Sequence, residues 1–308
     1  MSAPVAGTPP VPDGRPGLPV PDGRPGSPVV GLTGATGYVG GVVAAGLRAA
    51  GWRVVPLARS PRSDLPDARR LDLAAPVDPG ALVGLDALVH AAWDLQASRP
   101  ADAWRVNVGG SVRLLTAASA TGIGRVLFVS SMSAYPGTRQ TYGSTKLAVE
   151  TVAAALGQGV VRLGLVYGPA RGSGPGGMAG ALVRMASLPV TPLVAGSARQ
   201  FTVHEDDVRD AVPLLLGADG LPREPVGLAH PDPVAFRDVL RGLAPAGRCR
   251  FAPVPWRLVH GALRAGEALG VRLPFRSDSL LGLVRPAGSV PNGDVVAALG
   301  IRVRPFAP

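Results

Sequence analysis

Residues 29–40 read Val29-Val30-Gly31-Leu32-Thr33-Gly34-Ala35-Thr36-Gly37-Tyr38-Val39-Gly40. A short apolar run is followed here by a glycine-rich turn. An apolar run that ends in glycines is typical of a buried parallel strand. A helical pattern follows, from about Tyr38 to Ala50. The stretch therefore predicts a strand, a tight turn and a helix, which together begin a βαβ unit.

The glycines of this turn have distinct expected roles. Gly34 permits the tight turn, Gly37 lets the backbone approach a pyrophosphate, and Gly40 lets the helix pack against the strand. The amino end of the helix then offers free N–H groups and the positive end of its dipole to phosphates. We therefore expect a dinucleotide-binding turn made by Gly34, Thr36, Gly37, Tyr38, Val39 and Gly40.

Strands and helices alternate along the rest of the first half of the chain. The expected strands are 29–32, 52–58, 82–90, 125–129 and 160–166, and the expected helices are 38–50, 106–121 and 142–156. This alternation predicts an α/β fold of the Rossmann type, with a doubly wound parallel sheet. Ligands on such sheets bind outside the carboxyl ends of the strands.

The pattern predicts three parts of the chain. Residues 1–28 are rich in Pro and Gly and contain a short tandem repeat, so we expect a disordered, inert tail. Residues 29–168 are the expected NAD(P)-binding Rossmann domain. Residues 169–308 are expected to form mostly a small C-terminal substrate-binding cap, with helices near 178–187, 234–243 and 256–269, while 201–230 returns to the Rossmann sheet.

Composition limits the classes of partner. The formal charge of the 308 residues is +10, but Arg69-Arg70 is the only adjacent basic pair, so no nucleic acid partner is expected. The single cysteine excludes an internal disulfide, and no His/Cys spacing predicts a metal site. We find neither a signal-peptide pattern nor 18 uninterrupted apolar residues, so we expect a cytoplasmic protein without a membrane span.

The chain contains one lysine, and it lies four positions after a tyrosine in Tyr142-Gly143-Ser144-Thr145-Lys146. Residues i and i+4 share a face of a helix. An ammonium beside a phenol favours the phenolate and lowers the pKa of the tyrosine. The spacing therefore predicts Tyr142 as a general acid or base and Lys146 as its cationic neighbour.

The end of the second strand predicts which nicotinamide cofactor is bound. An acidic residue there would bind a ribose 2′-hydroxyl, whereas arginine accepts a 2′-phosphate. This strand ends with Arg59 and Arg62, and no carboxylate occurs before Asp64. We therefore expect NADP(H) in preference to NAD(H), with NAD(H) left open. The alternative is that Arg59 stacks on adenine without contacting the phosphate.

From about Val29 to Val208 the chain resembles the extended short-chain dehydrogenase/reductases, the NAD(P)-dependent epimerase/dehydratase family. The resemblance rests on ordered motifs. These are T-G-A-T-G-Y-V-G at 33–40, Asp72-Leu73, Ala91-Ala92, Asn107, V-S-S at 129–131, Tyr142 with Lys146, V-Y-G-P at 166–169, and V-H-E-D-D-V at 203–208.

The resemblance implies roles for residues at the matching positions. It implies that Tyr142 acts as the acid, with Ser131 holding the substrate oxygen and Lys146 bonding the nicotinamide ribose. Asn107 would lie near the same site, and a structural role at the start of its helix is an equal alternative. Further cofactor contacts are expected from Asp72, Leu73, Ala91, Ala92, Leu165 and Val166.

Three departures from the family pattern bear on the substrate. Ser131 and Tyr142 are close in sequence, Leu165 stands where many nucleotide-sugar enzymes have asparagine, and Met132-Ser133 replaces the Asp-Glu pair of sugar dehydratases. The differences weaken a nucleotide-sugar substrate and disfavour dehydration. Each candidate substrate contact is also a plausible core or surface residue; the candidates are Trp93, Met132, Ser133, Tyr167, Arg199 and His204.

The leading hypothesis is an NADPH-dependent oxidoreductase that reduces a ketone or aldehyde of a small, fairly hydrophobic metabolite. One alternative is a nucleotide-sugar epimerase with tightly bound NAD, and another is a non-catalytic NAD(P)-binding regulatory or assembly subunit. The helix at 256–269 is amphipathic; a membrane surface is one possible use for it, and packing against the cap is the expected one. The sequence does not identify the substrate, the stereochemistry, the direction of the reaction or the oligomeric state. A homodimer is left open.

Overall fold

The computed structural model describes residues 26–60, 67–95, 99–169, 177–218, 224–244, 250–271 and 276–307. Most of the expected tail and Arg62 lie outside these ranges, as does the segment 170–176 at the start of the expected cap.

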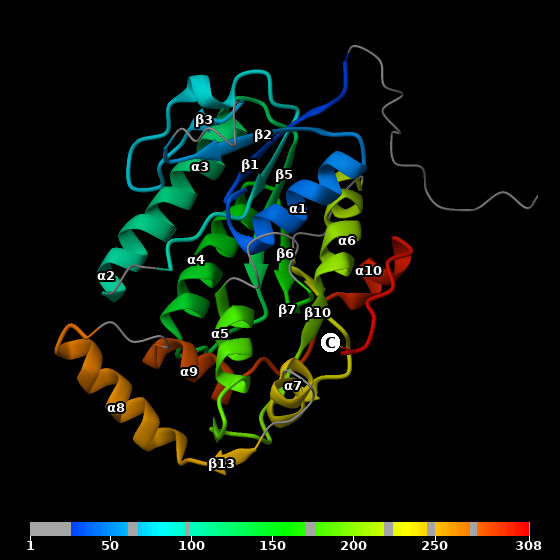
Figure 1. Ribbon diagram of the computed structural model, residues 1–308. Coiled ribbons are helices and arrows are strands. Elements are labelled where there is room, and N and C mark those ends of the chain that lie inside the picture. Colours follow the sequence, from blue (N-terminus) through cyan, green and yellow to red (C-terminus); the bar gives the residue numbers. More distant parts are fainter. Residues whose placement is uncertain are drawn as a thin grey trace, which may run out of the picture.

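A parallel sheet of seven strands forms the centre of the molecule (Figure 1), in the order β11-β6-β5-β4-β1-β2-β3. Its strands are β1 (Val29–Thr33), β2 (Arg53–Ala58), β3 (Arg69–Arg70), β4 (Ala87–His90), β5 (Arg125–Ser131), β6 (Gly159–Leu163) and β11 (Val226–Leu228). Strands β2 and β3 follow on one side of β1, and the chain then crosses to the other side, where β4, β5, β6 and β11 are added in turn. The carboxyl ends of β1 and β4 therefore form the point at which ligands bind to such sheets.

Helices cover both faces of this sheet. They are α1 (Tyr38–Ala49), α2 (Pro100–Ala103), α3 (Gly109–Ala120), α4 (Thr141–Ala155) and α6 (Glu205–Gly217), with a 3₁₀ helix at Pro79–Leu82 and a π-helix at Trp104–Val108. Helices α1 and α6 share one hydrophobic core with the sheet, and α3 and α4 share another. A Cβ on Gly46 of α1 would lie 2.0 Å from the carbonyl oxygen of Arg209, so glycine allows α1 to pack closely on α6.

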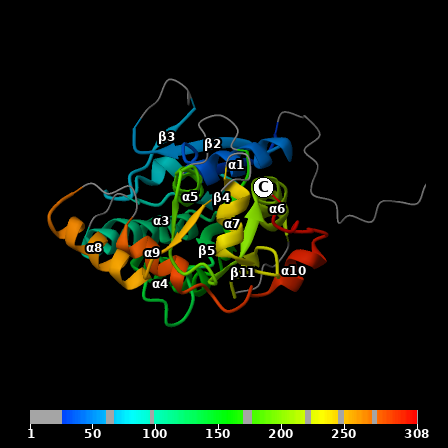
Figure 2. The same ribbon diagram turned by 60° about the horizontal axis from the view of Figure 1, so that its bottom comes forward.

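The remaining elements form a smaller body at the carboxyl edge of the sheet (Figures 1 and 2). Its helices are α5 (Gly177–Ala186), α7 (Phe236–Leu243), α8 (Trp256–Ala268) and α9 (Ser277–Val284), and α10 (Gly293–Ala298) lies near β11. Its short strands are β7 (Leu165–Tyr167), β8 (Thr191–Leu193), β9 (Arg199–Gln200), β10 (Thr202–His204), β12 (Val234–Ala235) and β13 (Phe251–Pro253). We call this body the cap. Its own core includes Leu182, Phe236, Val239, Leu240 and Leu280.

The predicted Rossmann-type fold is confirmed, but several element boundaries were wrong. The expected strand 82–90 begins only at Ala87, because Asp78 caps a 3₁₀ helix whose Leu82 is buried by packing. The expected strand 160–166 is interrupted at Gly164, after which β7 pairs with β10 outside the main sheet. Among the described residues, we find no helix with the length and apolar character needed to cross a bilayer.

Candidate active site

The amino end of α4 presents Tyr142, and contacts from two sides fix its position. The backbone N–H groups of Thr141 and Tyr142 donate to the carboxylate of Asp278 on α9, at 2.6 and 3.1 Å. A Cβ on Gly143 would lie 2.1 Å from the carbonyl oxygen of Ser133, so α4 starts tightly against the turn after β5. The cap and the sheet thus hold the start of α4 together.

Ser131 lies at the end of β5, beside the side chain of Tyr142. The hydroxyl of Ser131 also accepts the backbone N–H of Ser133 at 3.2 Å, which orients it. Burial raises the pKa of Tyr142 to about 12, and the neighbouring hydroxyl of Ser131 acts in the opposite direction. Tyr142 is therefore a protonated phenol at neutral pH, in contact with a hydroxyl group at the carboxyl edge of the sheet.

Lys146 lies one turn further along α4, and its side chain is buried, with 3% exposed. Its Nζ donates to the carbonyl oxygen of Val129 at 2.7 Å. It also lies 4.0 Å from the ring centroid of Trp93, 4.7 Å from that of Phe128 and 5.8 Å from that of Tyr142. These rings supply cation–π attraction in place of water.

Burial sets the pKa values of this pair more strongly than their proximity does. Burial lowers the pKa of Lys146 to about 7, and the carboxylate of Glu150 acts in the opposite direction. The expectation from the sequence was that Lys146 lowers the pKa of Tyr142. In the structure the pKa of Tyr142 is raised, because desolvation of the phenolate outweighs any attraction to the ammonium.

The glycine turn fits a pyrophosphate. A Cβ on Gly34 would lie 2.8 Å from the backbone nitrogen of Ala92, and one on Gly40 only 1.9 Å from the carbonyl oxygen of Gly34. Thr36 and Gly37 are exposed at the tip of the turn. The first turn of α1 has neither a side-chain cap nor an acidic residue, so its backbone N–H groups are available to an anion.

Tyr38 and Val39 begin α1, and both are half-buried. The hydroxyl of Tyr38 donates to Oε2 of Glu205 at 2.7 Å, so this side chain points toward α6. Burial and the neighbouring Glu205 carboxylate raise the pKa of Tyr38. At Tyr38 and Val39 it is therefore the backbone, more than the side chain, that suits a phosphate.

A buried network that the sequence analysis missed fixes the loop after β4. The hydroxyl of Thr33 accepts the backbone N–H groups of Ala91 and Ala92, at 3.1 and 3.0 Å. It is 2.7 Å from Nδ1 of His90, whose Nε2 is 2.7 Å from the hydroxyl of Ser111. Since Thr33 already accepts twice, its proton must go to Nδ1, which makes His90 neutral with its proton on Nε2.

His90 stays neutral for a physical reason. Burial lowers its pKa to about 3, and the charge of Lys146 acts in the same direction. The ring stacks on Phe128 at a centroid distance of 5.4 Å. The network thus holds Ala91 and Ala92 against the glycine turn without adding a charge beside Lys146.

Asn107 lies in the π-helix before α3 and is 1% exposed. Its Oδ1 accepts the backbone N–H of Asp94 at 2.7 Å, and its Nδ2 donates to the carbonyl oxygen of Asp94 at 3.0 Å. Both ends of the amide therefore hold the loop that carries Trp93. This geometry favours the structural alternative for Asn107.

A second missed group lies behind Lys146. Glu150 is one turn further along α4 and 4% exposed. Arg162 of β6 binds it through Nη2 at 2.6 Å and Nε at 3.0 Å, and the hydroxyl of Ser130 donates to the same carboxylate. Tyr142, Lys146 and Glu150 therefore occupy successive turns of one helix face.

The adenine side of the expected cofactor site lies beyond β2. Arg59 follows β2 directly and is exposed, and Arg62 lies outside the described residues. The carboxylate of Asp72 accepts the backbone N–H of Ala74 at 2.9 Å, and Leu73 is buried. Asp72 and Leu73 thus form a fixed turn after β3, next to the end of β2.

The structure brings only one of the predicted substrate contacts to Lys146 and Tyr142, namely Trp93. Most of the others have contacts elsewhere. Tyr167 is buried against Phe306 and donates to the carbonyl oxygen of Pro305 at 3.0 Å. His204 caps α6, Arg199 donates to the carbonyl oxygen of Pro233, Met132 packs with Phe201, and Ser133 contacts Ser131 through its backbone. Of the predicted cofactor contacts, Leu165 packs on the cap core and Val166 on the sheet core.

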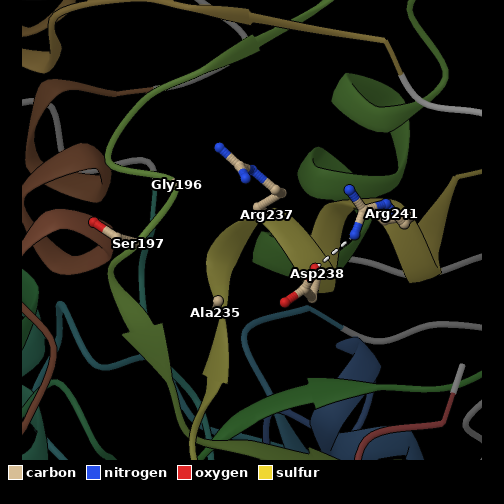
Figure 3. A pocket seen from close by; sticks show the side chains of 6 residues that line it. All are labelled: Gly196, Ser197, Ala235, Arg237, Asp238 and Arg241. Atoms are coloured by element: carbon tan, nitrogen blue, oxygen red, sulfur yellow. Dashed lines mark hydrogen bonds and ion pairs between the residues drawn. The ribbon is translucent and has the colours of Figure 1, made fainter.

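A shallow pocket of about 250 Å³ lies in the cap, at the amino end of α7 (Figure 3). It is lined by Gly196, Ser197, Ala235, Arg237, Asp238 and Arg241. Arg241 is paired with Asp238 at 2.7 Å, and the backbone N–H groups of Phe236 and Arg237 already have carbonyl partners. The pocket contains none of the residues around Tyr142 and is distinct from the candidate active site.

The sequence matches known proteins over most of its length. The family model described as "NAD dependent epimerase/dehydratase family" matches residues 30–224. The chain is 28% identical over 218 residues to the uncharacterized protein Rv2047c of Mycobacterium tuberculosis, which covers 70% of this chain but 23% of that protein. The chain thus spans about a quarter of the length of that relative.

Two further similarities concern named proteins. The chain is 27% identical over 255 residues to the ceramide reductase of Caulobacter vibrioides, covering 76% of this chain and 77% of that protein. The solved structure of MoeE5 in complex with UDP-glucuronic acid and NAD superposes with a TM-score of 0.65 at 24% identity, covering 91% of this chain and 95% of that chain. At this identity the superposition shows a shared fold.

Proposed function

Because the chain belongs to the NAD dependent epimerase/dehydratase family, whose members are enzymes of the extended short-chain dehydrogenase type, we propose that it is an NADPH-dependent reductase. Its substrate is a ketone or aldehyde of a fairly hydrophobic metabolite. The observation that carries the proposal is the contact between Ser131 and Tyr142, one turn before the buried Lys146. Residues 29–168 hold the cofactor, and the cap after 169 shapes the substrate side.

The protonation state of the phenol suits the reducing direction. A tyrosine whose pKa is raised to about 12 is protonated at pH 7 and can donate its proton to a carbonyl oxygen. The hydroxyl of Ser131 holds the same oxygen beside it. The charge of Lys146 stabilises the phenolate left after that transfer. NADPH supplies the hydride when bound.

The geometry of the two turns supports the proposed cofactor contacts. The backbone of the amino end of α1 holds the pyrophosphate, and Arg59, exposed after β2, meets the 2′-phosphate of NADPH. NAD(H) is the alternative. Arg59→Asp is therefore expected to lower the ratio of kcat/KM for NADPH to that for NADH by about tenfold or more. An unchanged ratio would remove Arg59 from cofactor selection.

The apolar surroundings support a hydrophobic substrate. Trp93 is half-buried and lies over Lys146, whereas Phe128 and Met132 behind it are buried in the core. The similarity to a ceramide reductase points in the same direction.

A nucleotide-sugar epimerase with tightly bound NAD is the alternative, supported by the family and by the fold shared with MoeE5. Mass spectrometry of the nucleotide released from the denatured protein separates the two, since an epimerase retains NAD. A non-catalytic NAD(P)-binding regulatory or assembly subunit is a weaker alternative, because such a protein has no need of Ser131, Tyr142 and Lys146 together.

The test of the reaction is Tyr142→Phe, assayed by NADPH oxidation with a panel of apolar ketones and aldehydes. We expect turnover to fall by about 10²- to 10⁴-fold while NADPH binding is retained. The matched control is Tyr135→Phe, because Tyr135 donates instead to the carbonyl oxygen of Arg285 at 2.7 Å. Full turnover of the Tyr142→Phe protein would exclude the mechanism.

A further inference from the structure

Helix α8 of the cap has an apolar stripe on its outer side. Leu258 and Leu269 are exposed by 69% and 82%, and Ala262 and Ala265 between them are exposed as well. The intervals of four, three and four residues place all four on one face of the helix. Large apolar side chains on a monomer surface usually occur singly, so a stripe of this kind calls for an explanation.

The opposite side of α8 already provides its attachment to the fold. Trp256, Val259 and Leu263 pack against the core of the cap. Glu267, the only carboxylate in α8, also faces inward and accepts the backbone N–H and the hydroxyl of Ser277, at 2.9 and 2.6 Å. Folding therefore accounts for the inner side of α8, but it does not account for the outer stripe.

The charges beside the stripe are of one sign. Arg257 and Arg264 are exposed and, being seven residues apart, lie on one flank of α8, between the stripe and the inner side, with Arg257 5.7 Å from the ring centroid of Trp256. With Glu267 turned inward, the outer side of α8 carries apolar and cationic groups and no carboxylate of its own. Val271, 52% exposed, continues the apolar surface past the end of the helix.

We propose that the outer face of α8 docks the chain on the surface of an anionic lipid bilayer. Leucines that enter the level of the acyl chains, with arginines beside them at the headgroups, are the pattern of a helix that lies in the interface. The formal charge of +10 attracts the whole chain to an anionic surface. The sequence left membrane contact and cap packing as alternatives, and the two sides of α8 are suited to one each.

The surface lies close to the candidate active site. Helix α8 packs on α9 (Figure 2), and Asp278 of α9 binds the backbone at the start of α4 beside Tyr142. Docking through α8 would thus place the cap, and not the amino edge of the sheet, against the bilayer. The docking does not depend on the proposed reaction, because it involves none of the residues that carry it.

Flotation of the purified full chain with lipid vesicles tests the proposal. Vesicles of phosphatidylcholine with about one third phosphatidylglycerol should bind the chain at low ionic strength, and vesicles of phosphatidylcholine alone should bind it far less. Arg257→Gln with Arg264→Gln should weaken binding by about 30-fold, and Leu258→Ser with Leu269→Ser by about tenfold or more.

A matched control uses an exposed apolar residue and an exposed arginine far from the cap. Val83, 67% exposed, precedes β4 at the amino edge of the sheet, and Arg48 is exposed near the end of α1. Val83→Ser with Arg48→Gln should leave vesicle binding unchanged. Equal binding by the α8 variants and this control would overturn the proposal, as would failure of the unaltered chain to float with anionic vesicles. Light scattering adds a further outcome: if the leucine variants dissociate an oligomer of a chain that does not float, the face is a self-interface and the proposal is wrong.

Discussion

Replacing Glu150 by Gln should lower the pKa of Lys146 further and weaken catalysis, although Glu150 is one turn of helix away from the lysine. Glu150 is 4% exposed, and its carboxylate raises the pKa of Lys146 against the larger effect of burial. Side chains four residues apart on a helix have Cβ atoms about 6 Å apart. At this distance and an effective dielectric constant of about 20, a unit charge contributes about 3 kcal/mol.

An interaction of that size corresponds to roughly two pKa units. We expect the pKa of Lys146, now about 7, to fall by roughly one to two units in Glu150→Gln, since relaxation around Arg162 will absorb part of the change. At pH 7 the protonated fraction of Lys146 would drop from about one half to about one tenth or less. If the ammonium is needed to stabilise the phenolate, kcat/KM should fall about fivefold or more at pH 7 and recover toward lower pH.

The sequence offers a direct assay, because Lys146 is the only lysine in the chain. Lysine labelled with ¹³C at Cε gives a single side-chain signal, whose shift titrates with the ammonium. The matched variant is Arg162→Gln, which leaves the Glu150 carboxylate without its arginine and should raise the pKa of Lys146. Both variants break the same buried ion pair and should cost about 3 kcal/mol or more of stability, so instability alone cannot produce opposite shifts. Shifts of the same sign in the two variants, or none in Glu150→Gln, would refute the reasoning.

The same titration has a consequence for stability. The folded pKa of Lys146, about 7, lies below its ordinary value of 10.5. Between these values the unfolded chain binds more protons than the folded one, so the contribution of this group to the unfolding free energy rises with pH. Below pH 7 the cost of burying the ammonium is present in full. In Glu150→Gln the pH range over which this contribution to the unfolding free energy rises should begin at a lower pH.

Two further predictions concern the backbone around the site. Gly40→Ala should lower the unfolding free energy by about 1–3 kcal/mol and abolish NADPH binding, because its Cβ would lie 1.9 Å from the carbonyl oxygen of Gly34; denaturant unfolding and a fluorescence titration measure the two effects. Gly41→Ala, where the nearest atom would be 3.9 Å away, is the control and should bind NADPH normally. Asp278→Asn weakens the hydrogen bonds at the amino end of α4 and should lower the unfolding free energy by about 1 kcal/mol. It should reduce kcat more than it changes the Kd for NADPH. The control is Asp294→Asn, at an exposed helix start, which should change neither kcat nor this Kd.

The sheet could be predicted from the sequence because its strands are buried on both faces. Each strand is then a short apolar run, and the run at Val29–Thr33 is marked further by the glycines that follow it. The error at 82–90 arose because Leu82 and Leu85 are apolar for another reason, since they pack from a 3₁₀ helix and a turn. An apolar run in the sequence indicates that its side chains are buried. It indicates a strand only where the backbone is also extended.

Helix α6 was missed, although its sequence carries the signals of a helix. His204 caps the helix through its side chain, and three acidic residues follow in the first turn, where the helix dipole favours them. The apolar residues Val208, Ala211, Val212 and Leu215 then recur at helical spacing. Pro213 inside the helix weakened the pattern, but the three acidic residues of the first turn indicate where the helix begins.

At the site, the sequence identified the residues joined by local spacing and missed those joined by the fold. Tyr142 and Lys146 are four residues apart, so helix geometry alone predicts their common face. Asp278 reaches α4 across 137 residues, and the hydroxyl of Thr33 reaches His90 across 57. Nothing in the sequence around Asp278 or His90 distinguishes them from other surface or core residues, because their roles depend on which strands and helices become neighbours.

The ammonium of Lys146 also shows how a buried charge can keep a donor for a ligand. An ammonium has three N–H donors, and among the described residues one hydrogen-bond acceptor is within reach, the carbonyl oxygen of Val129 at 2.7 Å. The ring of Trp93, 4.0 Å away, attracts the charge through its π face without binding a particular proton. Two of the three N–H groups of the Lys146 ammonium therefore have no oxygen partner among the described residues. A hydroxyl-bearing ligand that supplied such an oxygen would favour the protonated lysine and raise its pKa above 7, so binding the ligand and charging the lysine should reinforce each other.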